Sequence, residues 1–316
     1  MEVNEQTGGE VMPFSIGEEI VGRLYRERIH LQKMVNSNSD GLTYLALWRG
    51  QTVVVKLGEN IVNISLEIQR LMAINEAQET FPGPRLLGFD DVEKNGKVFA
   101  FYLTDYQSGL SLREALHKQV QGGRNWLWIV LQVLHHLEKL HQSGYVFGNW
   151  ERQHIIVCTE EKNSHVRFVN FDGVTRRGQE IKKWTALYDR GTWQAGSHVA
   201  DEAYDLFSLT LLILDEIFAC SLKLIKPEQR RPQTLYDIIR SNTYMPPALK
   251  KLFIRVLRGE VSSAQTYSYA LFAALAEGMC VRRSRLHQLW QRWLWECCFA
   301  TVSVLFLSIL YVAIQS

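Results

Sequence analysis

The feature that most constrains the fold is a change of hydrophobic pattern near residue 106 of this 316-residue chain. Before it, short runs rich in β-branched and aromatic residues alternate with turn residues, as in strands joined by hairpins. After it, apolar residues recur at the three- and four-residue spacing of long helices. The expected strands include 29–35, 42–48, 52–58 and 97–106, and the expected helices are 64–77, 125–141 and 203–219. The pattern predicts an α+β protein with a β-rich first part, containing one helix, and a helical second part.

Charge and cysteine content exclude two broad classes. The 35 Lys and Arg residues and 33 Asp and Glu residues give a net charge of +2, which argues against a surface basic throughout for nucleic acid. The five cysteines have no paired spacing and so argue against a structural zinc site. Two local clusters still predict docking to nucleic acid or anionic lipid, and scattered solvated charges are the alternative. Their residues are Lys223, Lys226, Arg230, Arg231, Lys250, Lys251, Arg255 and Arg258.

The C-terminal residues form an uncharged, mostly apolar run from Cys297 to Ile314. As a helix these 18 residues would span about 27 Å, slightly less than a bilayer core of about 30 Å. Tryptophans and arginines precede the run, including Arg282, Arg283 and Trp293, and such positive flanks favour the cytoplasmic side. The run predicts a single membrane anchor at 295–315 with the preceding chain in the cytoplasm. A buried C-terminal core helix remains the alternative.

Four motifs follow one another in the chain. The segment VVVK ends an expected strand at Lys56, and Glu67 lies eleven residues later in the next helix. Further on come LHQSGYVFGNWERQHIIV at 140–157, VRFVNFDG at 166–173 and AYDLFSL at 203–209. Their order and spacing resemble the bacterial eukaryotic-like (Hanks-type) Ser/Thr protein kinases across roughly residues 25–275. Together with YDRGTW at 188–193 and the C-terminal run, the chain looks most like the tail-anchored, sporulation-associated kinases of Bacillus-type bacteria.

The resemblance implies a bilobal kinase fold that binds ATP with Mg²⁺. It divides the chain into a weakly structured N-terminus (1–20), an N-lobe (21–105), a C-lobe (106–275), a basic juxtamembrane segment (276–294) and the anchor (295–315). It implies that Lys56 grips the ATP phosphates and pairs with Glu67, and that Asp205 anchors the catalytic-loop backbone. The further positions implied to contact the nucleotide are Gly41, Asp105 and Tyr106.

The chemistry departs from the family pattern at three positions. Asn149 stands at the catalytic Asp position, and an amide cannot accept a proton as a carboxylate does. His154 stands at the metal-binding Asn position, where imidazole is a poorer ligand for Mg²⁺. In the register set by the preceding strand, the metal-binding Asp aligns with Asn170. A slip of two residues would instead bring Asp172 to that position, followed by Gly173.

Three functions remain open on this sequence. The triple replacement predicts a membrane-tethered pseudokinase that acts as a scaffold or regulator of a partner protein, with residual nucleotide binding and without dependable Mg²⁺ binding. The first alternative is an active or atypical Ser/Thr kinase that transfers the ATP γ-phosphate with the help of Asp172. The second alternative is a module that binds anionic surfaces through its basic clusters.

Overall fold

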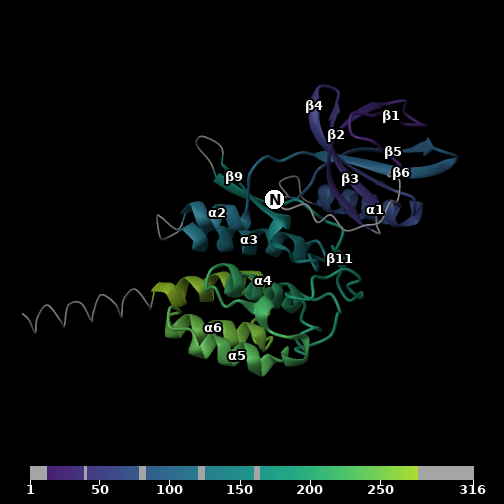
Figure 1. Cartoon of the computed structure of the whole chain (residues 1–316). Coiled ribbons are helices and arrows are strands. Elements are labelled where there is room, and N and C mark those ends of the chain that lie inside the picture. Colours follow the sequence, from purple (N-terminus) through teal and green to yellow (C-terminus); the bar gives the residue numbers. More distant parts are fainter. Residues whose placement is uncertain (1–12, 39–40, 78–82, 120–124, 160–163, 277–316) are drawn as a thin grey trace, which may run out of the picture.

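The computed structural model describes residues 13–38, 41–77, 83–119, 125–159 and 164–276. It has two lobes, shown in Figure 1: a twisted sheet with one helix in the N-terminal part, and a helical C-terminal part below it. The change of pattern near residue 106 therefore coincides with the passage from one lobe to the other. The strands and helices expected from the sequence are present, and most of their ends agree within a few residues.

The N-lobe sheet has six antiparallel strands in the order β1-β2-β3-β4-β6-β5. Tight turns at Arg49–Gly50 and Asn95–Gly96 have positive φ at both residues, which matches the right-handed twist of the strands they join. One face of the sheet encloses a core that includes Ile29, Tyr44 and Val55. The strands are β1 (Glu19–Val21), β2 (Arg28–Asn38), β3 (Gly41–Trp48), β4 (Gln51–Gly58), β5 (Leu86–Lys94) and β6 (Lys97–Asp105).

Helix α1 (Ile61–Ala77) covers the other face of this sheet. Its buried stripe comprises Ile64, Ile68, Leu71 and Ile74, at the spacing of one helix face. The adjacent Met72 is 40% exposed. One residue turns a helix by about 100°, so the neighbour of buried Leu71 points away from the sheet.

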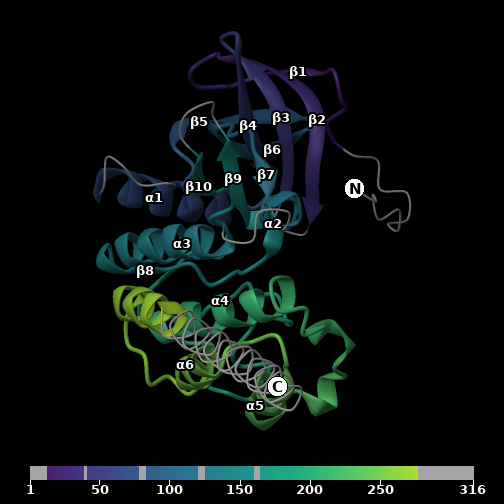
Figure 2. The same cartoon turned by 90° about the vertical axis from the view of Figure 1, so that its left-hand side faces the viewer.

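The C-lobe is built around α4 (Glu202–Glu216), in which every residue from Tyr204 to Leu214 is buried. This agrees with the sequence, which is apolar nearly all round the helix. Figure 2 shows α3 and α6 on opposite sides of α4. The remaining helices are α2 (Leu112–Gln119), α3 (Asn125–Gln142), α5 (Pro232–Ser241) and α6 (Pro247–Leu257), and residues 264–276 are also helical.

Two small sheets fix the loops between the lobes. Strands β7 (Leu110–Ser111), β9 (Ile155–Thr159) and β10 (Ser164–Phe168) form one, and β8 (Tyr145–Val146) pairs with β11 (Thr175–Arg176) in the other. These pairings hold the ends of the loops 147–154 and 169–174, which carry most of the unusual motif residues. The described part of this lobe also contains three short 3₁₀ turns: η2 (Arg152–His154), η3 (Leu222–Leu224) and η4 (Pro227–Gln229).

The predicted juxtamembrane segment (276–294) and membrane anchor (295–315) lie outside the described residues, apart from residue 276. Within the described ranges, no helix combines the length and apolar character that a membrane span requires.

Burial of His136 on α3 makes stability depend on pH. Burial lowers its pKa from 6.5 to about 4, and nearby His135, Lys139 and Arg167 act in the same direction. Below pH 6.5 the unfolded chain therefore binds a proton that the folded chain excludes. The folded state becomes less stable as the pH is lowered. We expect this group to lower the free energy of unfolding by about 2 kcal/mol at pH 5 relative to pH 7.5.

The measurement is denaturant unfolding of wild type and His136→Gln at both pH values. Glutamine does not titrate and can still donate to the carbonyl of Val166, which lies 3.0 Å from the histidine Nε2. A difference between the two proteins that stays the same at pH 5 and 7.5 would contradict the prediction.

Candidate functional site: a lysine and carboxylate cluster between the lobes

The site begins with a buried ion pair between the sheet and α1. Lys56 Nζ lies 2.9 and 2.7 Å from the two carboxylate oxygens of Glu67, and the Tyr102 hydroxyl donates to Glu67 Oε2 at 2.9 Å. Alternation along β4 explains the direction of Lys56, because Val55 and Leu57 on either side point into the opposite core. Burial, followed by the charge of Glu67, raises the pKa of the Tyr102 hydroxyl well above its ordinary value.

A second carboxylate and a second lysine complete the cluster. Lys183 Nζ lies 3.6 Å from Glu67 Oε1 and 3.6 Å from Asp172 Oδ2. Burial alone would raise the pKa of Asp172, but the charges of Lys183 and then Lys56 outweigh it. With a hydrogen bond from Asn149, they lower the pKa below its ordinary value and keep the carboxylate ionised. The cluster therefore contains two ammonium groups and two carboxylates.

The three replaced motif positions form a closed ring of hydrogen bonds with Asp172. His154 Nδ1 lies 3.0 Å from the Asn149 carbonyl oxygen, and Asn170 Nδ2 lies 3.1 Å from His154 Nε2. The Asp172 backbone N–H donates to Asn170 Oδ1 at 3.1 Å, and Asn149 Nδ2 donates to Asp172 Oδ1 at 3.4 Å. These partners assign the proton of His154 to Nδ1, because Nε2 must accept.

The ring decides whether the residues fit Mg²⁺. Both ring nitrogens of His154 have protein partners, so the imidazole has no free lone pair for a metal, and Asn170 Oδ1 already accepts from the Asp172 backbone. Asp172 alone adds a carboxylate, whereas Mg²⁺ usually needs several hard oxygen ligands in octahedral geometry. No group of three or more His, Cys, Asp or Glu residues suited to a metal occurs in the described part of the chain. These residues do not fit a magnesium site of the kinase type.

The two alternative metal positions lie in the same turn but have different partners. Asn170, the position expected from the strand register, contacts His154. Asp172, the position in the slipped register, contacts Asn149 and faces both lysines. The structure thus brings both candidates into one turn. Of the two, Asp172 alone has a carboxylate, and its charge interacts with that of Lys56.

The loop that carries Asn149 is held by the buried carboxylate of Asp205, as the family resemblance implied. The backbone N–H groups of Phe147 and Gly148 donate to its two oxygens at 2.7 and 3.0 Å. The Trp150 indole N–H donates at 2.8 Å, and His141 Nε2 lies 2.9 Å away. Asp205 is fully buried in α4, so these donors replace the water that an exposed carboxylate would bind.

Two site residues come from the segment after β11, which has no regular pattern in the sequence. One is Lys183 of the lysine and carboxylate cluster. The other is Thr185, whose hydroxyl donates to Glu151 Oε1 at 2.7 Å and lies 3.4 Å from Asn149 Oδ1. Lys183 stands in no recognisable motif, so the sequence offers no signal for it.

The remaining predicted nucleotide contacts have clear structural roles. Gly41 has φ +142°, and a Cβ there would lie 2.1 Å from the Leu57 carbonyl oxygen, so the strand pairing itself requires glycine. The Asp105 carboxylate accepts a hydrogen bond from the backbone N–H of Arg85 and lies 3.3 Å from Arg167 Nη2. This ion pair connects the two lobes and occupies the carboxylate. Tyr106, at the junction of the lobes, has a side chain 42% exposed.

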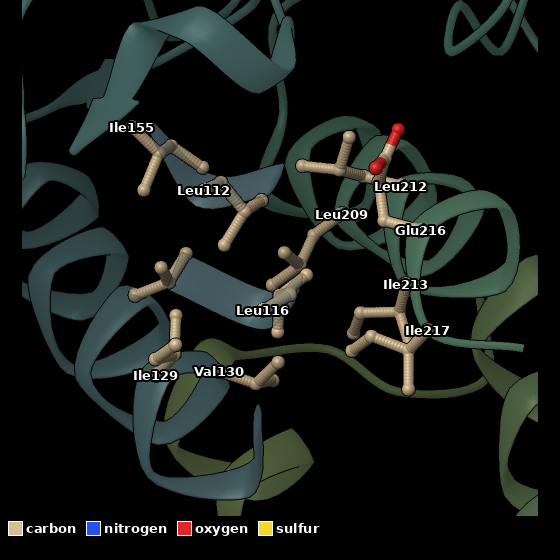
Figure 3. Close-up of a pocket in the computed structure, with 11 residues that line it drawn as sticks. Leu112, Leu116, Ile129, Val130, Ile155, Leu209, Leu212, Ile213, Glu216 and Ile217 are labelled. Atoms are coloured by element: carbon tan, nitrogen blue, oxygen red, sulfur yellow. The ribbon is translucent and has the colours of Figure 1, made fainter. Parts of the chain in front are cut away.

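A small apolar cavity lies elsewhere, between α2, α3 and α4. Leu116, Val130 and Leu209 point into it, and Glu216 lies at its edge (Figure 3). Its volume of about 10 Å³ gives room for roughly one water molecule. Because it shares no residue with the cluster and cannot hold a nucleotide, we treat it as a packing defect of the C-lobe.

The two-lobed fold, the strand lysine paired with a helix glutamate and the anchored loop define a protein kinase-like chain. A solved structure of vaccinia related kinase 3 aligns with a TM-score of 0.61 at 18% identity, covering 84% of this chain and 92% of the other. No protein-family model matches the chain.

The sequence relationship points to a particular group of kinases. The chain is 29% identical to the serine/threonine-protein kinase YabT of Bacillus subtilis (strain 168) over 252 residues, which is 78% of this chain and 72% of the relative. Together with the fold, this similarity relates the chain to the Hanks-type protein kinases and to that Bacillus kinase in particular.

Removing the Asp205 carboxylate should unfold the anchored loop. In Asp205→Ala, two backbone N–H groups and an indole N–H lose their acceptor in a buried place. We expect a loss of about 3–5 kcal/mol in the free energy of unfolding, measured by denaturant unfolding in mild detergent. The control is Asp237→Ala, because that side chain is 62% exposed and its ion pair with Arg240 should contribute less than about 1 kcal/mol. Equal losses in the two variants would refute the anchoring role.

Proposed function

We propose that this protein is a pseudokinase that uses its kinase fold as a scaffold or regulator of a partner protein. The observation that carries the proposal is the ring formed by Asn149, His154, Asn170 and Asp172. Phosphoryl transfer depends on metal ions that neutralise the phosphates and on a group that orients the attacking hydroxyl. In this chain the corresponding residues are hydrogen-bonded to one another through side-chain and backbone atoms.

The position of Asn149 supports the same proposal. Its side-chain N–H donates to Asp172, and its side-chain Oδ1 is 3.4 Å from the Thr185 hydroxyl. A neutral amide can orient a hydroxyl but cannot remove its proton at neutral pH. Lys56 and Glu67 keep the arrangement that grips nucleotide phosphates in kinases, so nucleotide binding without transfer fits the geometry.

One observation favours the alternative of an atypical kinase. Asp172 is ionised and its carboxylate is near Lys56, so it could take part in transfer in an altered geometry. The two functions differ in one measurable way: an atypical kinase transfers the γ-phosphate of ATP, and a pseudokinase does not.

The test measures phosphate transfer from γ-labelled ATP to the protein itself and to a general Ser/Thr substrate, with Mg²⁺ and with Mn²⁺. We expect no incorporation by the full-length wild type. The triple variant Asn149→Asp, His154→Asn and Asn170→Asp, which restores the family residues, is the matched comparison and should gain activity if the fold is otherwise intact. Incorporation by wild type that is lost in both Lys56→Met and Asp172→Asn would establish the atypical kinase instead.

We also propose that the apolar run 297–314 anchors the protein in the cell membrane, with the kinase-like part in the cytoplasm. The support is its uncharged composition and the arginines that precede it. The anchor would concentrate the scaffold at a surface where its partner resides. The basic clusters offer weaker support for a separate anionic-surface function, because Arg255 and Arg258 pair with Glu260 at 3.4 and 3.7 Å.

Membrane attachment predicts that the full chain stays with membranes through an alkaline carbonate wash. Changing Leu305 and Leu307 to lysine should release it, because each charge at the centre of a spanning helix costs about 2.5–3.5 kcal/mol. The control changes Arg283 and Arg285 to lysine, which preserves the flanking charge and should leave the protein in the membrane pellet. Release of wild type by carbonate, or retention of the Leu305→Lys/Leu307→Lys variant, would contradict the anchor.

A further inference from the structure

The lysine and carboxylate cluster contains a cation where a kinase would need a metal. Lys183 Nζ bridges Glu67 Oε1 and Asp172 Oδ2 at 3.6 Å each. These carboxylates come from different lobes, one from α1 and the other from the turn after β10. Both side chains are nearly buried, with 7% and 8% of their surface exposed. Two carboxylates at this depth require positive charge close by, since burial disfavours their ionised forms.

Lys56 alone would leave this cluster with one excess negative charge. Lys183 removes the excess, and it is the first of the cations that lower the pKa of Asp172. Its side chain is 25% exposed, against 9% for Lys56, so it reaches the cluster from the solvent side. The segment after β11 thus supplies the charge that a bound divalent ion would otherwise supply.

We propose that the Lys183 ammonium is a tethered cation that replaces the divalent metal, so that the site binds the polyphosphate chain of a nucleoside triphosphate without Mg²⁺. The proposal deepens the pseudokinase function and rests on the nucleotide binding included in it. It also explains why the residues of the ring, Asn149, His154, Asn170 and Asp172, can bond one another and do not have to bind a metal ion. The polyphosphate is held by Lys56 and Lys183, and no group is positioned to drive transfer of its γ-phosphate.

The direction of the two ammonium groups favours a polyphosphate. Lys56 and Lys183 lie 2.9 and 3.6 Å from the same oxygen, Glu67 Oε1, so their charges converge on one place. The ion pairs of Lys183 with Glu67 and Asp172 are longer than a hydrogen bond, and a phosphate oxygen can replace them with a shorter, charge-assisted bond. Ammonium groups also bind phosphate without fixed geometry, as point charges with three donors.

The proposal makes an unusual prediction about Mg²⁺. In a site that uses metal ligands, Mg²⁺ strengthens binding of ATP. In a site that uses lysines, Mg²⁺ coordinates the same phosphate oxygens as the ammonium groups and reduces their charge. Wild type should therefore bind ATP in EDTA at least as tightly as it binds ATP with excess Mg²⁺.

The experiment is a thermal-shift and calorimetric titration of the full chain in detergent, with ATP in EDTA and with ATP plus Mg²⁺. Lys183→Met keeps much of the side-chain length without its charge and should weaken binding in EDTA about tenfold, the effect of one lost charge-assisted bond. Lys183→Arg keeps the charge and should retain most of the affinity. Lys182→Met is the matched control, because Lys182 is the exposed neighbour and should bind as wild type.

Three results with ATP itself would overturn the proposal: no binding in EDTA, a requirement for Mg²⁺, or equal affinity of Lys183→Met and wild type. Adenosine and inorganic tripolyphosphate are tested alongside ATP. A response to tripolyphosphate supports recognition of the phosphates, whereas a response to adenosine equal to that of ATP would refute it. None of these results depends on phosphate transfer, so the metal-free site can fail while the pseudokinase function stands, and label incorporation can refute that function independently.

Discussion

The geometry of the site depends first on the carboxylate of Asp205. It is fully buried in α4, a helix enclosed on all sides, so its charge must be balanced by nearby donors. The backbone of Gly148 and the indole of Trp150 supply two of them, on either side of Asn149 in the chain. The loop therefore keeps its shape whatever the chemistry of residue 149. A kinase loop can lose its catalytic carboxylate in this way without losing its conformation.

The replacements in the site are consistent with one another electrostatically. Three family positions carry neutral side chains, and these satisfy their hydrogen bonds with each other and with Asp172. A site with fewer carboxylates has less need of divalent cations, and the two that remain in the cluster are matched by Lys56 and Lys183. A change at one of these positions alone would leave a partly buried donor or acceptor without its partner, which costs free energy. The four residues are thus best understood as one unit.

The sequence predicted the fold because each part of it rests on local pattern. Strand alternation and helix spacing were sufficient to place Lys56 and Glu67 on facing elements. The same reasoning could not choose between Asn170 and Asp172, because side-chain direction within a turn is set by hydrogen bonds across the loop. It missed Lys183 for a related reason. The segment after β11 has no periodicity, and distant contacts hold it, such as the Gly178 N–H to the Ala200 carbonyl at 2.8 Å.

Glu67 connects these observations to the proposed regulatory function. Its carboxylate binds Lys56 from the N-lobe sheet and Lys183 from a C-lobe segment, so it couples α1 to both lobes. A ligand that draws either ammonium away changes the charge that holds α1 and the segment together. That segment also presents Trp184, 39% exposed and stacked on His198 at 4.2 Å. A surface that adjoins the cluster can thus respond to its occupancy, because a ligand shifts an equilibrium by its unequal affinity for two states. Phosphate transfer is not needed for such coupling, and a kinase fold retained for regulation would keep these contacts and lose the metal ligands.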